Sequence, residues 1–104
     1  MRVITNIDTK PRLLETDLAP DVVEKLPTFR QLLKVLISTT TEKNPETALD
    51  LYEAGLKIMN ANGTVELEDS QWRHLHNKAR ENAPGWFVPF HAQVVELLEK
   101  AEKK

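Results

Sequence analysis

The segment Lys57–Asp69, KIMNANGTVELED, decides how this chain folds, because local structure changes three times within it. A helical apolar pattern ends there in two asparagines and Gly63, which tolerate the left-handed backbone of a turn. In TVELE, residues 64–68, apolar residues alternate with glutamates, which is typical of a short strand with one buried face. Asp69 can then cap a helix. We therefore predict a helix, a turn, a short strand and a second helix.

The same segment partly matches a calcium-binding EF-hand loop. With Gly63 at the sixth position of such a loop, Asn60 and Asn62 fall at ligand positions three and five and Asp69 at twelve. The first position would be Ile58, which has no side-chain oxygen. A calcium loop without its first carboxylate is a poor hypothesis, and a turn explains the same residues.

Two helices are predicted on the N-terminal side of this segment. Thr28 and Gln31 have the spacing of a capping box, and the apolar residues that follow at helical intervals are Phe29, Leu32, Leu33, Leu36 and Ile37. Asn44 and Pro45 start the next helix. Its apolar residues form a stripe of the kind that packs on a core: Ala48, Leu49, Tyr52, Leu56 and Met59, widened by Leu51 and Ile58.

Two further helices are predicted on the C-terminal side. The first starts at Asp69 or Ser70, and its inner side holds Trp72, Leu75, His76 and Ala79. The second has Pro89 in its first turn, and its expected buried residues are Phe90, Val94, Leu97, Leu98 and Ala101. The last residues, EKAEKK at 99–104, are expected to fray.

The N-terminal residues are predicted to complete a small sheet. RVITNI, residues 2–7, alternates as a strand does, RLLE at 12–15 would be a return strand, and residues 18–27 would be a connector. Since a lone strand is not stable, we expect residues 64–68 to pair with the N-terminal strand. The predicted fold is α+β and mostly helical, with about four helices and an N-terminal strand or hairpin pairing with a short strand between helices two and three. It is one domain, 1–104, with a helical body at 28–104.

The composition is that of an ordinary folded domain. The chain has 104 residues, of which 40% are hydrophobic and 29% charged, and it has no cysteine, which excludes disulfides and thiolate metal sites. No apolar run is long enough for a signal peptide or a membrane span. The net charge is −2 and both halves are balanced, so the basic excess typical of nucleic-acid-binding proteins is missing.

No catalytic residue, cofactor or metal site is predicted. His74 and His76 are two residues apart and point in different directions on a helix, and His91 could bring only a second ligand to His76, whereas zinc needs three or four. The three glycines are scattered and form no phosphate-binding loop. The acidic residues have the spacing of solvated helix faces and caps. We therefore predict that the protein is not an enzyme.

Two groups of residues are candidates for binding. The aromatic residues Trp86, Phe87 and Phe90 lie together between prolines, with Trp72 on the preceding helix, and such residues either close a small core or anchor a partner protein. A basic bias occurs on one helix, where a DNA-recognition face would consist of Arg73, Asn77, Lys78 and Arg80. Glu81 and the acidic helix that follows favour an ordinary solvated face.

The order of these elements resembles a loose family of small accessory proteins encoded by tailed phages and prophages. The resemblance rests on a Thr-opened apolar helix, TFRQLLKVLI, on YEAGLKIMN, on the VEL strand, on the acid-opened helix after it, and on the Pro-started helix PFHAQVVELLEKAE. PFHAQ stands where a smaller, more glycine-containing stretch would be expected. The resemblance implies a protein of the host-cell cytoplasm that works by contact with another protein, and it assigns no catalytic residue.

The sequence therefore favours a non-enzymatic, protein-binding accessory module of phage type, active in virion assembly or on a host factor. Its expected partner is another phage or host protein, with no membrane. The alternative is a small DNA-associated regulator that uses the basic helix, although the charge balance argues against nucleic acid. Self-association through the edges of the small sheet is a further option.

Overall fold

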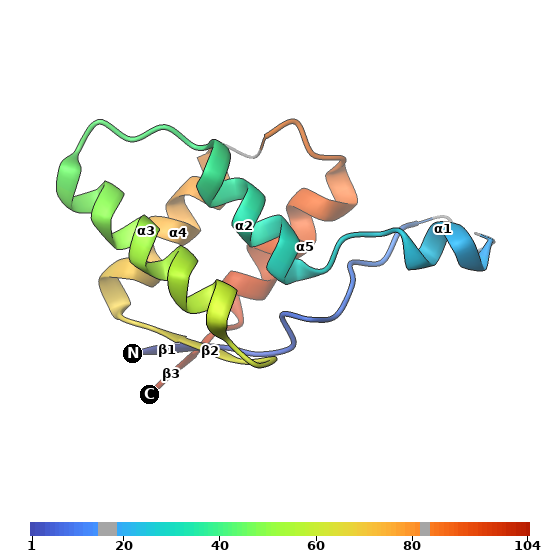
Figure 1. Cartoon of the computed structure of the whole chain (residues 1–104), viewed down its shortest axis with the longest axis horizontal. Helices are drawn as coiled ribbons and strands as arrows, with labels where there is room; N and C mark the ends of the chain where they lie inside the picture. The colour runs from blue at the N-terminus through green and yellow to red at the C-terminus, as the bar shows by residue number, and fades with distance from the viewer. Residues whose placement is uncertain (15–18, 82–83) are drawn as a thin grey trace.

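Four substantial helices and a small sheet make up the fold of this protein. The computed structural model describes residues 1–14, 19–81 and 84–104. In chain order the elements are β1 (Arg2–Ile4), α1 (Pro20–Glu24), α2 (Phe29–Thr39), α3 (Pro45–Asn60), β2 (Val65–Leu67), α4 (Asp69–Glu81), α5 (Val88–Glu99) and β3 (Glu102–Lys103). The strands line one side of the helical body, and α1 lies apart from it (Figure 1). The predicted mostly helical α+β fold is confirmed.

The sheet has the strand order β2-β1-β3, and both pairs are antiparallel. Ile4 pairs with Val65 and Arg2 with Leu67, which confirms the predicted pairing of the N-terminal strand with residues 64–68. On the other side of β1, Arg2 pairs with Lys103. The prediction that residues 99–104 fray was therefore wrong. Buried Ala101 anchors the chain end, because its carbonyl accepts a hydrogen bond from Arg2 Nη1 at 3.3 Å.

The N-terminal segment forms no hairpin over the residues that the structure describes. Arg12–Leu14 are not in a strand, and Glu15, the last residue of the predicted return strand, lies outside the described part. The Gln93 side chain explains the difference, because its amide bonds both the N–H and the carbonyl of Arg12, at 2.8 and 2.5 Å. A side chain of α5 thus takes the place of a partner strand. The predicted connector contains α1, which Pro20 starts and which buries no residue.

Helix α2 begins as its sequence predicts. Gln31 N–H donates to Thr28 Oγ1 at 3.2 Å, and Thr28 N–H donates to Gln31 Oε1 at 2.8 Å, which completes a capping box. The buried face of the helix consists of Phe29, Leu32, Leu33 and Leu36, and Ile37 is half-buried against the same core. This helix is therefore a central part of the core.

Helix α3 begins as predicted but buries a different face. The Asn44 side chain accepts hydrogen bonds from the amides of Glu46 and Thr47, and Pro45 is the first residue of the helix. The buried residues are Leu51, Ala54 and Ile58, whereas most of the predicted stripe, Leu49, Tyr52, Leu56 and Met59, is exposed. The prediction was therefore wrong for these four residues, whereas Leu51 and Ile58, which were predicted to widen the stripe, are buried. The helix ends at Asn60, and Gly63, with a φ of 79°, turns the chain into β2.

Helices α4 and α5 complete the core beneath α2 and α3. Gln71, on α4, is buried and links α4 to α3, since it accepts from Lys57 Nζ at 2.9 Å and donates to Glu53 Oε2 at 3.0 Å. The other core residues of these two helices are Leu75, Ala79, Val94 and Leu98, and the sheet contributes Ile4, Val65 and Leu67. Phe90 and Leu97 are only half-buried, although both were predicted to be buried.

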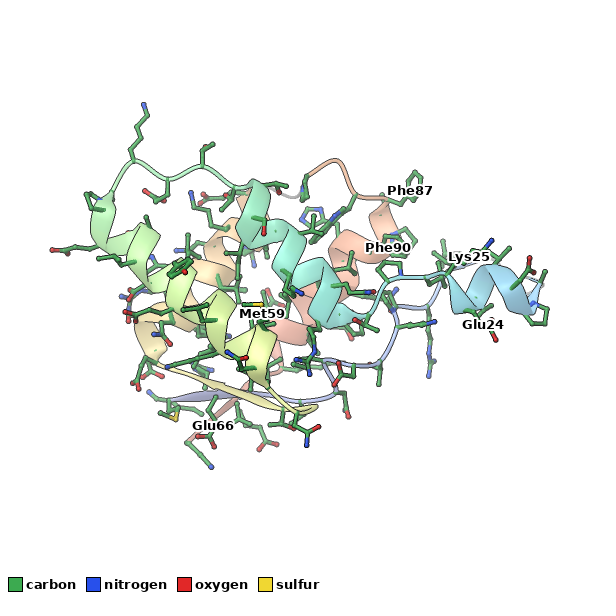
Figure 2. All side chains as sticks on the ribbon, in the orientation of Figure 1. Glu24, Lys25, Met59, Glu66, Phe87 and Phe90 are labelled. Carbon is green, nitrogen blue, oxygen red and sulfur yellow. The ribbon has the colours of Figure 1, made fainter. Side chains whose placement is uncertain are left out.

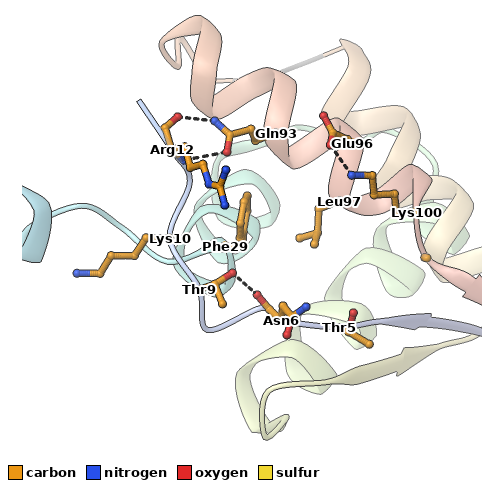
Figure 3. A pocket seen from close by; sticks show the side chains of 11 residues that line it. Thr5, Asn6, Thr9, Lys10, Arg12, Phe29, Gln93, Glu96, Leu97 and Lys100 are labelled. Atoms are coloured by element: carbon orange, nitrogen blue, oxygen red, sulfur yellow. Dashed lines mark hydrogen bonds and ion pairs between the residues drawn. The ribbon is translucent and has the colours of Figure 1, made fainter. Parts of the chain in front are cut away.

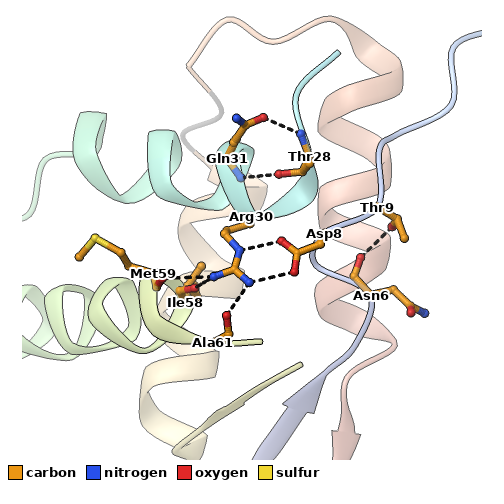
Figure 4. Close-up of polar contacts among 9 residues, drawn as sticks. All are labelled: Asn6, Asp8, Thr9, Thr28, Arg30, Gln31, Ile58, Met59 and Ala61. Carbon is orange, nitrogen blue, oxygen red and sulfur yellow. Dashed lines mark hydrogen bonds and ion pairs between the residues drawn. The ribbon is translucent and has the colours of Figure 1, made fainter. Parts of the chain in front are cut away.

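One arginine ties three segments together at the C-terminal end of α3. Arg30 donates to both carboxylate oxygens of Asp8, at 2.8 and 2.9 Å, and to the carbonyls of Ile58, Met59 and Ala61 (Figure 4). The last carbonyls of a helix lack partners within the helix. The Arg30 guanidinium donates the missing hydrogen bonds to these carbonyls, and the Asp8 carboxylate orients the guanidinium from the opposite side.

The carboxylates in such pairs predict how stability depends on pH. The hydrogen bond from Arg30 lowers the pKa of Asp8, and hydrogen bonds from Lys78 and Lys104 lower the pKa values of Glu42 and Glu66. Groups whose pKa is lowered on folding stabilise the fold above their unfolded pKa, roughly 4, and lose that contribution as the pH falls through the folded pKa.

We therefore expect the melting temperature to fall as the pH is lowered from about 5 towards 3. Glu42→Gln should flatten this profile, because an amide does not titrate. Circular dichroism melts at a series of pH values measure both effects. Parallel profiles for the wild type and Glu42→Gln would show that this ion pair does not contribute to acid sensitivity.

Candidate protein-binding site

The exposed stripe of α3 is the first candidate site. Leu49, Tyr52 and Met59 are 60%, 63% and 49% exposed, and Leu56 lies beside them at 37%. Large apolar side chains in a continuous row on the surface often mark a site of protein interaction. Met59 is labelled near the end of α3 in Figure 2. The stripe exists because α3 packs on its neighbours through Leu51 and the residues that follow it at helical spacing.

A hollow lies between this stripe and α2. It has a volume of about 160 Å³ and is lined from α3 by Tyr52, Gly55, Leu56 and Met59, and from α2 by Lys34, Ile37 and Ser38. We call these seven residues the α2–α3 groove. A Cβ at Gly55 would lie 3.4 Å from Ile37 Cγ2, an ordinary van der Waals contact. The absence of a side chain at Gly55 therefore makes the groove deeper by about one methyl group. The backbone conformation at this position does not require glycine.

A second hollow adjoins the groove along α2. It has a volume of about 550 Å³, and Lys34 and Ser38 line both hollows. Its remaining lining residues are Lys25, Pro27, Gln31, Val35 and Thr39. Among the residues that the structure describes, Lys25 and Lys34 are the charged ones that line the two hollows, and no carboxylate lines either of them. The combined surface is apolar with a basic side.

The aromatic residues that were predicted to form one cluster differ in their burial. Trp86 and Phe90 are half-buried against the core, whereas Phe87 is 75% exposed and Val88 is 79% exposed at the start of α5. The rings of Phe87 and Phe90 lie 6.3 Å apart (Figure 2). At this end of α5, Trp86 and Phe90 therefore pack on the core, whereas Phe87 and Val88 form a second exposed apolar patch.

Trp72 lies at the other end of α5 and is not part of that patch. Its indole N–H donates to the Leu98 carbonyl at 2.8 Å, its ring stacks on His76 at 5.0 Å, and the Arg2 guanidinium lies 4.1 Å above it. Leu98 and Phe87 are separated by roughly 17 Å along a helix with a rise of 1.5 Å per residue. The structure thus places Trp72 where α4, α5 and β1 meet.

The four residues of the predicted DNA-binding face differ in whether they already form ion pairs within the protein. Arg73 and Asn77 are exposed. Lys78 is paired with Glu42 at 2.8 Å and donates to the Thr41 carbonyl, and Arg80 is paired with Glu99 at 2.9 Å. Contacts to nucleic-acid phosphates would compete with these ion pairs. Use of this face for DNA stays a prediction.

The three histidines have separate partners. His74 lies 3.5 Å from Asp50, His76 lies 3.3 Å from Glu99, and His91 contacts the Ala79 carbonyl at 2.8 Å. Over residues 1–14, 19–81 and 84–104, no three metal-ligating side chains gather closely enough to hold an ion. None of the helices in these ranges is long and apolar enough to span a membrane.

A polar cleft between the N-terminal segment and α5 is a further concave feature. It has a volume of about 480 Å³, Phe29 and Leu97 line it, and its polar side chains include Asn6, Thr9 and Gln93 (Figure 3). Lys10 already donates to the last carbonyls of α1, Lys100 pairs with Glu96, and Gln93 bonds the backbone. Because these groups serve the fold, the cleft has less to offer a ligand than the α2–α3 groove.

Comparison of the chain with models of protein families, with curated proteins and with solved structures found no match.

Proposed function

We propose that this protein is a non-enzymatic binding module that holds another protein against the α2–α3 groove. The observation that carries the proposal is the exposed row on α3, Leu49, Tyr52, Leu56 and Met59. Because the other face of α3 is packed on the core, the backbone that carries these side chains is held in place. Binding then orders few groups of this protein, which lowers the entropic cost of association.

The chemistry of the groove is typical of the centre of a protein interface. Aromatic residues and methionine are enriched in interfaces, tyrosine because it combines a large apolar ring with a hydroxyl, and methionine because its flexible thioether adapts to a partner. Tyr52 and Met59 flank the hollow above Gly55. An apolar side chain of a partner could enter the hollow between them and contact Ile37.

The resemblance to small tailed-phage proteins extends this proposal to the biological context. We infer that the partner is a phage protein in virion assembly or a factor of the host cell, met in the host cytoplasm. The exposed stripe supports the binding role, and capture of the partner would identify it.

Leu56→Asp is expected to weaken partner binding at least about tenfold, because it places a carboxylate in the apolar hollow. The partner is first captured by a photoreactive benzoylphenylalanine at position 52 and identified by mass spectrometry. Its affinity for the purified variants is then measured by calorimetry. Since Leu56 is partly exposed, we expect Leu56→Asp to keep the circular dichroism spectrum of the wild type.

Val88→Asp is the matched control, since it makes the same change on the exposed patch at the start of α5. We expect it to bind the partner like the wild type. The opposite result, in which Val88→Asp loses binding and Leu56→Asp keeps it, would move the site to the Phe87 patch and contradict the proposal for the groove.

A further inference from the structure

We infer that the segment bound by the groove is an amphipathic helix with acidic residues along one side of its apolar face. This inference rests on the proposed function and names the chemistry of the partner. Three properties of the groove support it: the charge of its lining residues, the kind of elements that form it, and the position of the nearby carboxylates of this chain.

The charge of the lining is the first argument. Lys34 lies on the ridge shared by the two hollows, and within the described residues it makes no ion pair or side-chain hydrogen bond. Lys25 lines the same surface further along. A partner that covers this ridge excludes water from the Lys34 ammonium, which favours a carboxylate opposite it. Acidic residues on the partner therefore complement the basic side of the groove.

The helical walls are the second argument. The groove is built from side chains of α2 and α3, whose backbone groups are already bonded within each helix. An extended peptide would find no backbone partners there and would leave its own amides unpaired. A helix satisfies its backbone internally and presents apolar side chains at i, i+3, i+4 and i+7, which suits a groove between two helices.

The position of the nearby carboxylates argues against a second copy of this chain as the occupant. A two-fold contact brings the same surface of both copies together, so Lys34 would need an acidic residue on the α2–α3 face. Asp50 and Glu53 lie instead on the side of α3 that faces α4, where they contact His74 and Gln71. Since no carboxylate of the described residues lines the groove or the adjoining hollow, a symmetric pair through them would bring no lining carboxylate to Lys34.

Two synthetic peptides and one charge reversal test this inference. Both peptides are 18-residue helices with leucines at the spacing given above, and they differ only in carrying glutamates or lysines beside the leucines. Titration into ¹⁵N-labelled protein, followed by two-dimensional NMR, should shift amide signals of α2 and α3. We expect the acidic peptide to bind roughly tenfold more tightly than the basic one, with the difference decreasing at high salt.

Lys34→Glu should reverse this preference, and Lys34→Gln should abolish it. Lys34 is exposed, so both variants are expected to fold. Equal affinity of the two peptides, or an acidic preference that survives Lys34→Glu, would overturn the inference. So would binding to vesicles of phosphatidylserine and phosphatidylcholine without binding to either peptide, or a dimer that Leu56→Asp dissociates in analytical ultracentrifugation.

These results can be told apart from a failure of the proposed function. If Leu56→Asp abolishes capture of the natural partner while Lys34→Glu has no effect on either peptide, the groove is the binding site and the acidic helix is wrong. If the natural partner binds Leu56→Asp as well as the wild type, the proposed function itself fails.

Discussion

Trp72→Ala is expected to lower the free energy of unfolding by about 3 kcal/mol, within the range for truncating large core side chains. The ring is half-buried, carries a hydrogen bond to Leu98, stacks on His76 and lies under the Arg2 guanidinium. Its removal therefore weakens the junction of α4, α5 and β1 together. Urea unfolding followed by far-ultraviolet circular dichroism measures the loss.

Trp72→Phe distinguishes the contribution of the aromatic ring to stability from that of the indole hydrogen bond. It keeps an aromatic side chain but removes the indole N–H, so a loss of only about 1 kcal/mol is expected. Wild-type stability of Trp72→Ala combined with loss of partner capture would contradict this account. It would make Trp72 part of a binding surface, as the sequence alone suggested, and not a structural contact.

Arg30→Ala is expected to lower the melting temperature by several degrees. It leaves the carbonyls at the end of α3 and the Asp8 carboxylate without their shared donor. Arg30→Lys should recover only a minor part of the loss, because an ammonium cannot reproduce the planar set of donors that bonds Asp8 and the helix end together. Differential scanning calorimetry measures both variants.

Asp8→Asn is the control for Arg30. It removes the charge of the pair but keeps an oxygen that accepts a hydrogen bond, so its effect should be smaller than that of Arg30→Ala. If Asp8→Asn and Arg30→Ala lowered the melting temperature equally, the ion pair and not the bonds to α3 would account for the role of Arg30.

The starts of α2 and α3 could be predicted because their capping signals are local, whereas α1 lies in a segment that was predicted to be a connector. Thr28 and Gln31 bond each other across three residues, and Asn44 caps the two amides just after Pro45. These contacts need no knowledge of the rest of the molecule. The pairing of residues 64–68 with the N-terminal strand was predictable for a different reason, since each strand needed a partner.

The buried face of α3 could not be predicted from periodicity. The helix carries two adjoining apolar stripes, one through Leu51 and Ile58 and one through Tyr52 and Met59. Helical spacing fits both, and the choice depends on neighbours such as Gln71, which bonds the Leu51 side of α3 to α4 through Glu53 and Lys57. The candidate site was missed for this reason, because its residues had been assigned to the core.

Long-range partners explain the other differences. Glu102–Lys103 has no apolar alternation, and it is in a strand only because β1 lies beside it. The four aromatic residues are close in sequence, yet α5 separates Trp72 from Phe87. The exposed apolar row beside Lys34, which makes no ion pair with the described residues, can be recognised only when the packed stripe of α3 is known.

The central position of β1 has a consequence for the kinetics of folding. Arg2 pairs with both Leu67 and Lys103, so completing the sheet joins segments that are separated by most of the chain. The helix pairs α2/α3, α3/α4 and α4/α5, by contrast, join neighbours in sequence. Bringing distant segments together lowers the entropy of the chain before their contacts stabilise it. We expect the helices to associate early and the sheet to form last. Removal of the β3 pairing should therefore increase the unfolding rate more than it decreases the folding rate.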